Sequence, residues 1–269
     1  MNKSIFLREL RGNAIALLAW TAIITFLTTA TMSLYSIFLE NNVKIMAMIS
    51  ILPEGALQFK GVSNVNDLFS VLGFYSANNV IYMLVLGSIY SIVLSSNILL
   101  KEEYGRTAEY LLSWPVTRGQ VFFSKLAVVI INILVINLVI TVAGYISLET
   151  CKKEDYNVDA FLIISLFTLL LHFFFAALGL FMSVLVKKPR PITTLSIALV
   201  MVLYFIYTIS NITPDLSWAG YVSPYKFIDL DVVNPAYRID PVNILYFTVF
   251  PFLLIFSSLR IYLRKDIYL

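Results

Sequence analysis

KEEYGRTAEYLLSWPVTRGQVFFSK, residues 101–125, is a polar interruption between two long apolar stretches of the chain. Thr107 is placed to cap a helix beginning at Ala108, with Glu109 in the first turn, where the helix dipole favours a carboxylate. Pro115 ends this helix because proline cannot donate a hydrogen bond to the preceding turn. The pattern predicts a short amphipathic helix outside the membrane.

A second helix is predicted to begin directly after the first. The run Thr117-Arg118-Gly119-Gln120 matches a capping box, in which the first and last side chains each bond the other's backbone N–H. Val116 and Val121 are spaced as the hydrophobic staple that accompanies such a start. Residues 101–120 therefore form a structured connection between two apolar helices.

The composition indicates an integral membrane protein. The chain has 269 residues, of which 59% are hydrophobic and 13% charged, whereas soluble domains are about half apolar and about a quarter charged. Six segments lack Asp, Glu, Lys and Arg, and each can supply the roughly 20 residues of a helical span. We predict an all-α membrane protein with a single transmembrane domain over 1–269. Its six transmembrane helices are expected at about 13–36, 74–100, 121–148, 160–186, 192–210 and 242–263.

The distribution of positive charge predicts the orientation. Of the 19 Lys and Arg residues, 13 lie on one side of the predicted spans, together with both termini. The positive-inside rule puts that side in the cytoplasm, so we predict a multi-pass protein of the cell membrane with cytoplasmic termini. The formal net charge of +3 follows from this topology and suggests no nucleic-acid partner.

Residues 1–11 are expected to form a separate interfacial helix on the inner leaflet. Arg8 and Arg11 share one face of it, and Phe6 and Leu10 share the other. We expect a hinge at Gly12, where this helix would turn into the first span.

The motifs needed for catalysis are missing from the sequence. No G-x-x-x-x-G-K-[ST] phosphate loop occurs, so the chain is not expected to hydrolyse ATP by itself. His172 is the only histidine and Cys151 the only cysteine, so neither a metal site nor a bound cofactor is predicted. A membrane-embedded enzyme would need a clustered catalytic set, which the sequence does not offer.

His172 is the titratable group that must be weighed as a functional residue, because it lies near the middle of a predicted span. Such groups are costly and often functional, so a proton relay is one reading. A relay needs partners, and the other charge-free segments supply none. We favour a neutral imidazole that is hydrogen-bonded to a neighbouring helix.

Small and polar residues recur at helical spacing on two spans. Ser88, Ser91 and Ser95 form one stripe, and Asn137 and Thr141 form another. Helix–helix packing is the common reason for such stripes. A substrate path lined by these five side chains is the alternative.

The polar interruption resembles the hallmark segment of ABC-2 transporter permeases, which lies between their second and third spans. The matching residues are Glu102, Glu103, Gly105, Thr107, Glu109, Leu111, Leu112, Pro115, Val116, Thr117, Arg118, Val121 and Lys125. One departure is Arg106, which separates Gly105 from Thr107. Together with six spans and the N-terminal segment, the resemblance covers essentially the whole chain.

The resemblance implies a permease subunit that works with two copies of a separate ABC ATPase, which would carry the ATP and Mg. It also implies a second permease copy or a paralogue in the same complex. Residues 101–120 would contain the coupling helix that docks on the ATPase. The residues assigned to this contact are Glu102, Glu103, Thr107, Glu109, Leu111, Leu112, Trp114, Pro115 and Arg118.

The function predicted on this basis is ATP-driven export. We expect an amphipathic peptide, a hydrophobic drug or a lipid-like molecule as the substrate, which would fit a role in antimicrobial-peptide resistance. The competing reading is a secondary transporter or channel that uses His172.

Overall fold

The computed structural model describes residues 2–49, 51, 68–104, 116–186, 192–228 and 240–264. Within these ranges the chain is helical and contains no strand. The α-helices are α1 (Lys3–Ser33), α2 (Tyr35–Glu40), α3 (Asn42–Ile49), α5 (Val71–Tyr75), α6 (Ser88–Tyr104), α8 (Arg118–Cys151), α9 (Val158–Leu185), α10 (Ile192–Ile212) and α11 (Pro241–Arg264). Two π-helical turns, η2 (Ser76–Val80) and η3 (Met83–Gly87), and two 3-10 segments, η4 (Pro214–Val222) and η5 (Pro224–Phe227), complete the description.

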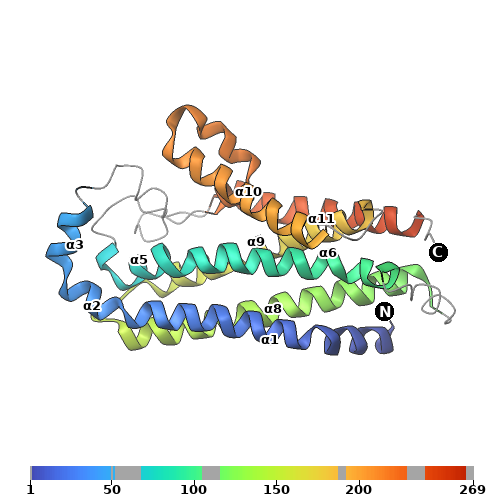
Figure 1. The fold of residues 1–269 in the computed structure, drawn as a ribbon, viewed down its shortest axis with the longest axis horizontal. Coiled ribbons are helices and arrows are strands. Elements are labelled where there is room, and N and C mark those ends of the chain that lie inside the picture. Colours follow the sequence, from blue (N-terminus) through green and yellow to red (C-terminus); the bar gives the residue numbers. More distant parts are fainter. Residues whose placement is uncertain are drawn as a thin grey trace.

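Six helical stretches in the described ranges are long and apolar enough to cross a membrane. They are Lys3–Glu40, Met83–Lys101, Arg118–Cys151, Val158–Leu185, Ile192–Ile212 and Pro241–Arg264. The predicted all-α fold with six spans is thus confirmed. Consecutive long helices run in opposite directions, so both chain ends lie at one end of the bundle, which we call the termini end (Figure 1).

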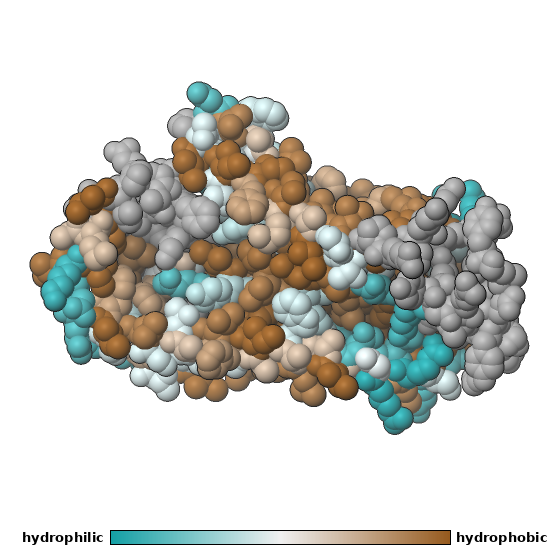
Figure 2. Space-filling model, viewed as in Figure 1, coloured by the Kyte–Doolittle hydropathy of each residue, from teal (hydrophilic) through white to brown (hydrophobic). Residues whose placement is uncertain are grey.

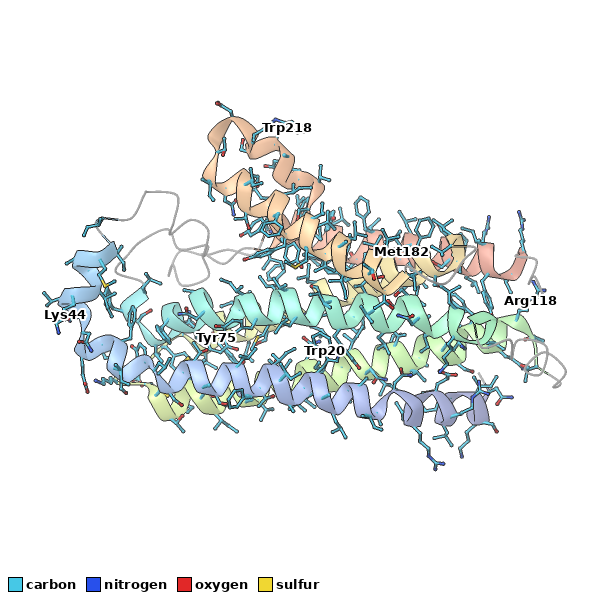
Figure 3. The ribbon with its side chains drawn as sticks, viewed as in Figure 1. Trp20, Lys44, Tyr75, Arg118, Met182 and Trp218 are labelled. Carbon is cyan, nitrogen blue, oxygen red and sulfur yellow. The ribbon has the colours of Figure 1, made fainter. Side chains whose placement is uncertain are left out.

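The helices do not contribute equally to the bundle. The closest neighbours are α6 with α9 and α1 with α8, and α11 packs along α9. Helix α10 also touches α6, but together with η4 it forms a hairpin that leans away from the other helices (Figure 1). Lys44 lies at the end opposite to Arg118, which marks the termini end (Figure 3).

The hinge expected at Gly12 is absent from helix α1, so this prediction is wrong. The helix runs without a break from Lys3 to Ser33, about 46 Å at 1.5 Å per residue. A single glycine costs a helix only about 1 kcal/mol. Helix α1 is bonded to α8 on both sides of Gly12, through Asn2 to Ser124 and through Met32 to Cys151. Ile5 and Glu9, one and two turns into the helix, are buried instead of lying free on a surface. Their position relative to a lipid interface stays a prediction.

The second span and the residues that lead into it are irregular. This stretch begins as α5, widens into the π-helical turns η2 and η3, and returns to regular geometry in α6. Two carbonyl groups of η3 are contacted by side chains from elsewhere: Met83 O by the His172 ring and Leu84 O by the Tyr225 hydroxyl, at 3.0 and 3.4 Å. The wide turns thus lie where other parts of the chain press against this span.

Close approach of α6 and α9 depends on small residues. A Cβ added to Gly179 would lie 2.6 Å from the Ile92 carbonyl oxygen and 2.1 Å from Oγ of Ser95. Glycine therefore lets the two backbones touch, as small residues do in membrane helix pairs.

Large apolar side chains cover the outside of the bundle. Ile15, Leu138 and Phe252 are exposed by 81%, 65% and 68%. Hydrophobic residues dominate the middle of the surface, and hydrophilic residues gather toward its two ends (Figure 2). Soluble proteins rarely expose apolar surface on this scale, whereas hydrocarbon would cover it favourably.

Candidate functional site

The start of α8 has the geometry that its sequence predicts. Oγ1 of Thr117 accepts a hydrogen bond from the Gln120 backbone N–H at 3.2 Å. In return, Oε1 of Gln120 accepts one from the Thr117 N–H at 3.0 Å, so the capping box is confirmed. Val116 packs against the buried pair Ile5 and Val121. The hydrophobic staple is therefore present, with a residue of α1 added to it.

Two further contacts tie this start to the chain termini. The backbone N–H of Asn2 donates to Oγ of Ser124 at 2.8 Å, and Nη1 of Arg118 donates to the Leu263 carbonyl at 3.4 Å. Helices α1 and α11 therefore both hold the first turns of α8.

A buried carboxylate connects α1 with both helices that flank residues 105–115. Glu9 is fully buried, and its side chain forms a salt bridge with Lys101 of α6. Nζ of Lys125, in the second turn of α8, lies 3.9 Å from Oε1 of Glu9 and is also buried. Lys125 in addition donates to the carbonyl of Ile98 on α6. Arg8, more exposed, lies 3.3 Å from the same carboxylate. Burying charges in this way is costly unless they are paired.

Of the nine residues assigned to the coupling contact, three lie in the described part of the chain. Thr107, Glu109, Leu111, Leu112, Trp114 and Pro115 lie outside the described residues. Glu102 and Glu103 belong to the last turn of α6. Arg118, the first residue of α8, points toward the end of α11 (Figure 3). Their role in binding an ATPase stays a prediction.

The serine stripe of the second span lies inside the bundle. Ser88, Ser91 and Ser95 are fully buried. Ser91 donates to the Gly87 carbonyl and Ser95 to the Ser91 carbonyl, each at 2.8 Å. With Gly179 against Ser95, this stripe serves the packing of α6 on α9.

His172 joins three spans. Its Nδ1 lies 3.0 Å from Oδ1 of Asn137 on α8, and its Nε2 lies 3.0 Å from the carbonyl oxygen of Met83. The predicted hydrogen bond to a neighbouring helix is confirmed. Both contacts are oxygen acceptors, and a neutral ring has one N–H, so it donates to one of them at a time.

The space around His172 is small. Asn137 and Thr141 line it with His172, Ser165 and Thr168, and its volume of about 10 Å³ fits about one water molecule. The structure thus brings Asn137 and Thr141 together with His172. A substrate path along the five candidate residues stays a prediction.

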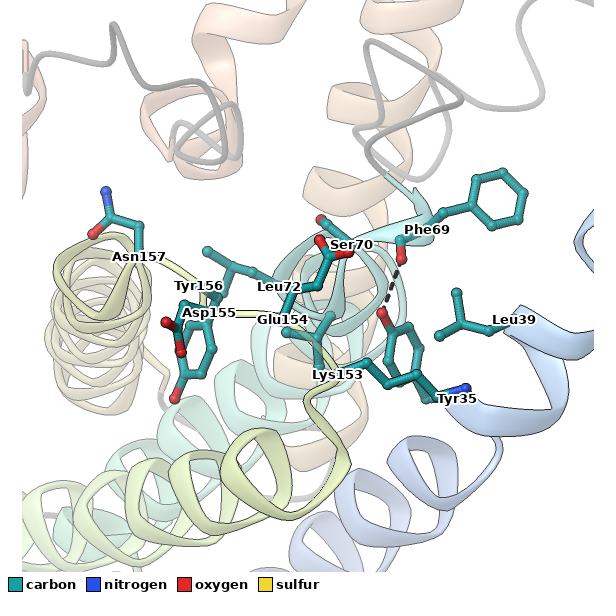
Figure 4. Close-up of a pocket in the computed structure, with 11 residues that line it drawn as sticks. Tyr35, Leu39, Phe69, Ser70, Leu72, Lys153, Glu154, Asp155, Tyr156 and Asn157 are labelled. Atoms are coloured by element: carbon teal, nitrogen blue, oxygen red, sulfur yellow. Dashed lines mark hydrogen bonds between the residues drawn. The ribbon is translucent and has the colours of Figure 1, made fainter.

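A larger pocket opens at the end opposite to the termini, between α2, the start of α5 with the two residues before it, and the loop that follows α8 (Figure 4). Its volume is about 280 Å³. Oη of Tyr35 donates to the Phe69 carbonyl at 2.8 Å on one wall, and Glu154 and Tyr156 lie on another (Figure 4). Burial, and then the neighbouring Glu149, raise the pKa of Tyr156 to about 12, so its hydroxyl stays protonated at neutral pH. Among the described residues, no group of three His, Cys, Asp or Glu side chains could hold a metal.

The family model described as "ABC-2 family transporter protein" matches residues 14–267, nearly the whole chain. The chain belongs to the ABC-2 transporter family. This ABC-2 protein is therefore a multi-pass membrane component of an ABC transporter, a family associated with ABC ATPase subunits. No curated protein matched the chain.

Sequence reasoning missed Glu9 in this ABC-2 protein. Its signal was present, since an acid stands between Arg8 and Arg11 in an otherwise basic segment that precedes a charge-free run. The partners Lys101 and Lys125 are far away in sequence, and no local pattern connects them with Glu9.

Proposed function

We propose that this chain is the permease subunit of an ATP-driven exporter, working with two copies of a separate ABC ATPase and a second permease copy or paralogue. The family match over residues 14–267 carries the proposal. The sequence has no phosphate loop, so the ATP and Mg would reside on the ATPase. The subunit itself would be non-catalytic.

The anchored ends of residues 105–115 support the coupling role of this segment. A contact that transmits force must be attached to a stiff support. At the termini end, the capping box, the bond from Arg118 to α11 and the salt bridge from Glu9 to Lys101 provide one. Docking would then move the long helices instead of bending a slack loop.

The distribution of polar and apolar side chains favours an amphipathic or lipid-like substrate. Ser91 and Ser95 of the second span and Asn137 of the third are turned inward, where they are hydrogen-bonded to the backbone or to His172. Many large apolar side chains are exposed on the outside of the bundle, and they dominate the middle of the face shown in Figure 2. An amphipathic peptide, hydrophobic drug or lipid-like molecule could reach such a surface from the inner leaflet, and its export would lower the toxicity of membrane-active peptides.

Purification of the tagged full-length chain from its native host tests the partnership. We expect a protein with a Walker-A phosphate loop to co-purify in mild detergent, in one copy per permease chain. An unrelated six-span protein with the same tag serves as the control. Recovery of the intact chain without any nucleotide-binding protein would contradict the exporter proposal.

The contacts of His172 keep one alternative open, since two acceptor oxygens face a single titratable ring. If the histidine has only a packing role, His172→Gln should retain most transport, because glutamine keeps a donor and an acceptor. His172→Leu should lower the yield of folded protein, since an unsatisfied buried polar group costs about 1–3 kcal/mol. Export measured between about pH 5 and 8, around the ordinary titration range of histidine, checks this. A pH dependence that disappears together with activity in the Gln variant would favour the proton-coupled transporter.

A further inference from the structure

We propose that Glu9 is a positioning residue for the ATPase contact: its buried carboxylate holds the end of α6 and the start of α8 together, and so fixes both ends of the segment between them. The inference rests on the proposed function for its consequence, and on the Glu9 contacts for its geometry.

The geometry places one carboxylate between two helices that the chain connects only through residues 105–115. One Glu9 oxygen pairs with Lys101, three residues before the end of α6. The other faces Lys125, which lies in the second turn of α8. Lys125 also donates to the Ile98 carbonyl, so α6 and α8 are joined directly as well as through Glu9.

The burial of this cluster makes its geometry specific. Glu9 and Lys125 are exposed by 0% and 1%, and Lys101 by 42% in its side chain. In such surroundings a charge is poorly tolerated without its partner, so the paired arrangement is strongly preferred over alternatives. The unbroken α1 carries Glu9 to this point, and Asn2 secures its first turn through Ser124.

Three substitutions test the positioning role by hydrogen exchange in detergent-purified full-length protein. In Glu9→Gln, backbone amides of residues 96–104 and 118–125 should exchange at least about tenfold faster, while those of α9 keep their protection. Lys101→Met should have a smaller effect on exchange in the same peptides. It should have no further effect when added to Glu9→Gln, because Glu9→Gln already breaks the Glu9–Lys101 contact. Glu40→Gln, an exposed carboxylate at the end of α2, is the matched control and should change nothing there.

A double variant keeps the test available if Glu9→Gln does not fold. Glu9→Met combined with Lys125→Met replaces both buried charges by apolar side chains of similar length, and such replacement of a buried ion pair is often neutral or stabilising. Its melting temperature should stay close to that of the parent, while the two flanking peptides still lose protection. If the amides of these peptides exchange at the same rate as in the parent, or if protection is lost equally throughout the bundle, the proposal is overturned.

Binding of the ATPase and stimulation of its ATP hydrolysis provide the second measurement. With the co-purified ATPase, the double variant should retain binding of the ATPase but lose most of the stimulation of ATP hydrolysis, whereas Glu40→Gln keeps it. Full stimulation in the double variant would overturn the positioning role. If the parent binds no ATPase, the exporter proposal fails, and the exchange experiment still decides whether Glu9 fixes the two helix ends.

Discussion

Leu112→Asp is expected to abolish stimulation of the partner ATPase while leaving membrane insertion intact. In the predicted coupling helix, Leu112 shares an apolar face with Ala108 and Leu111. Burying a leucine side chain in a docking cleft contributes roughly 1.5–3 kcal/mol, and an aspartate there adds the cost of an unpaired buried charge. The binding constant should fall by a factor of about 100 or more, since 1.4 kcal/mol corresponds to about tenfold.

The measurement is ATP hydrolysis by the reconstituted complex, together with recovery of the ATPase on the tagged permease. Leu216→Asp is a suitable control, because this leucine lies in η4, outside the six candidate spans. Stimulation that is equal in Leu112→Asp and in the parent would mean that the docking face lies elsewhere.

Gly179→Ala is expected to give the largest loss of stability. The added methyl group would lie 2.6 Å from the Ile92 carbonyl oxygen and 3.1 Å from the Ser96 backbone nitrogen. Rotation of Ser95 could relieve its own clash, but backbone atoms of α6 can give way only if the helices move apart. Overpacking costs about 1–3 kcal/mol or more, and each kcal/mol lowers the melting temperature of a chain of this size by about 2–4 °C.

Gly12→Ala is the matched control within the same chain. A Cβ on Gly12 meets no atom within 4 Å, and alanine favours a helix over glycine by about 1 kcal/mol. We expect its melting temperature in detergent to equal or exceed that of the parent. A Gly179→Ala protein as stable as Gly12→Ala would show that α6 and α9 do not pack as closely as described.

The sequence was a good guide where the signal is local. The charge-free runs predicted six spans, and Thr117 with Gln120 predicted the start of α8 to the residue. These features depend on residues at most a few turns apart. Hydrophobicity and capping therefore determine them without reference to the rest of the fold.

Features that depend on distant partners could not be predicted in the same way. Gly12 suggested a hinge, because the contacts with α8 that keep α1 continuous are invisible in the local pattern. The burial of Glu9 and Lys125 requires helices α1, α6 and α8 to meet at one point. The serine stripe was ambiguous until Gly179 was seen to pack against it.

The wide turns of the second span bear on the order in which the protein is made. Synthesis proceeds from the N-terminus, so Met83 and Leu84 enter the membrane before the ribosome has added His172 or Tyr225. The carbonyls of a π-helical turn still bond backbone N–H groups of the same helix, five residues further on, so the second span can enter hydrocarbon with its backbone satisfied. The bonds that His172 and Tyr225 make to Met83 and Leu84 can form only at a later step of biogenesis, when the fourth span and η5 have arrived.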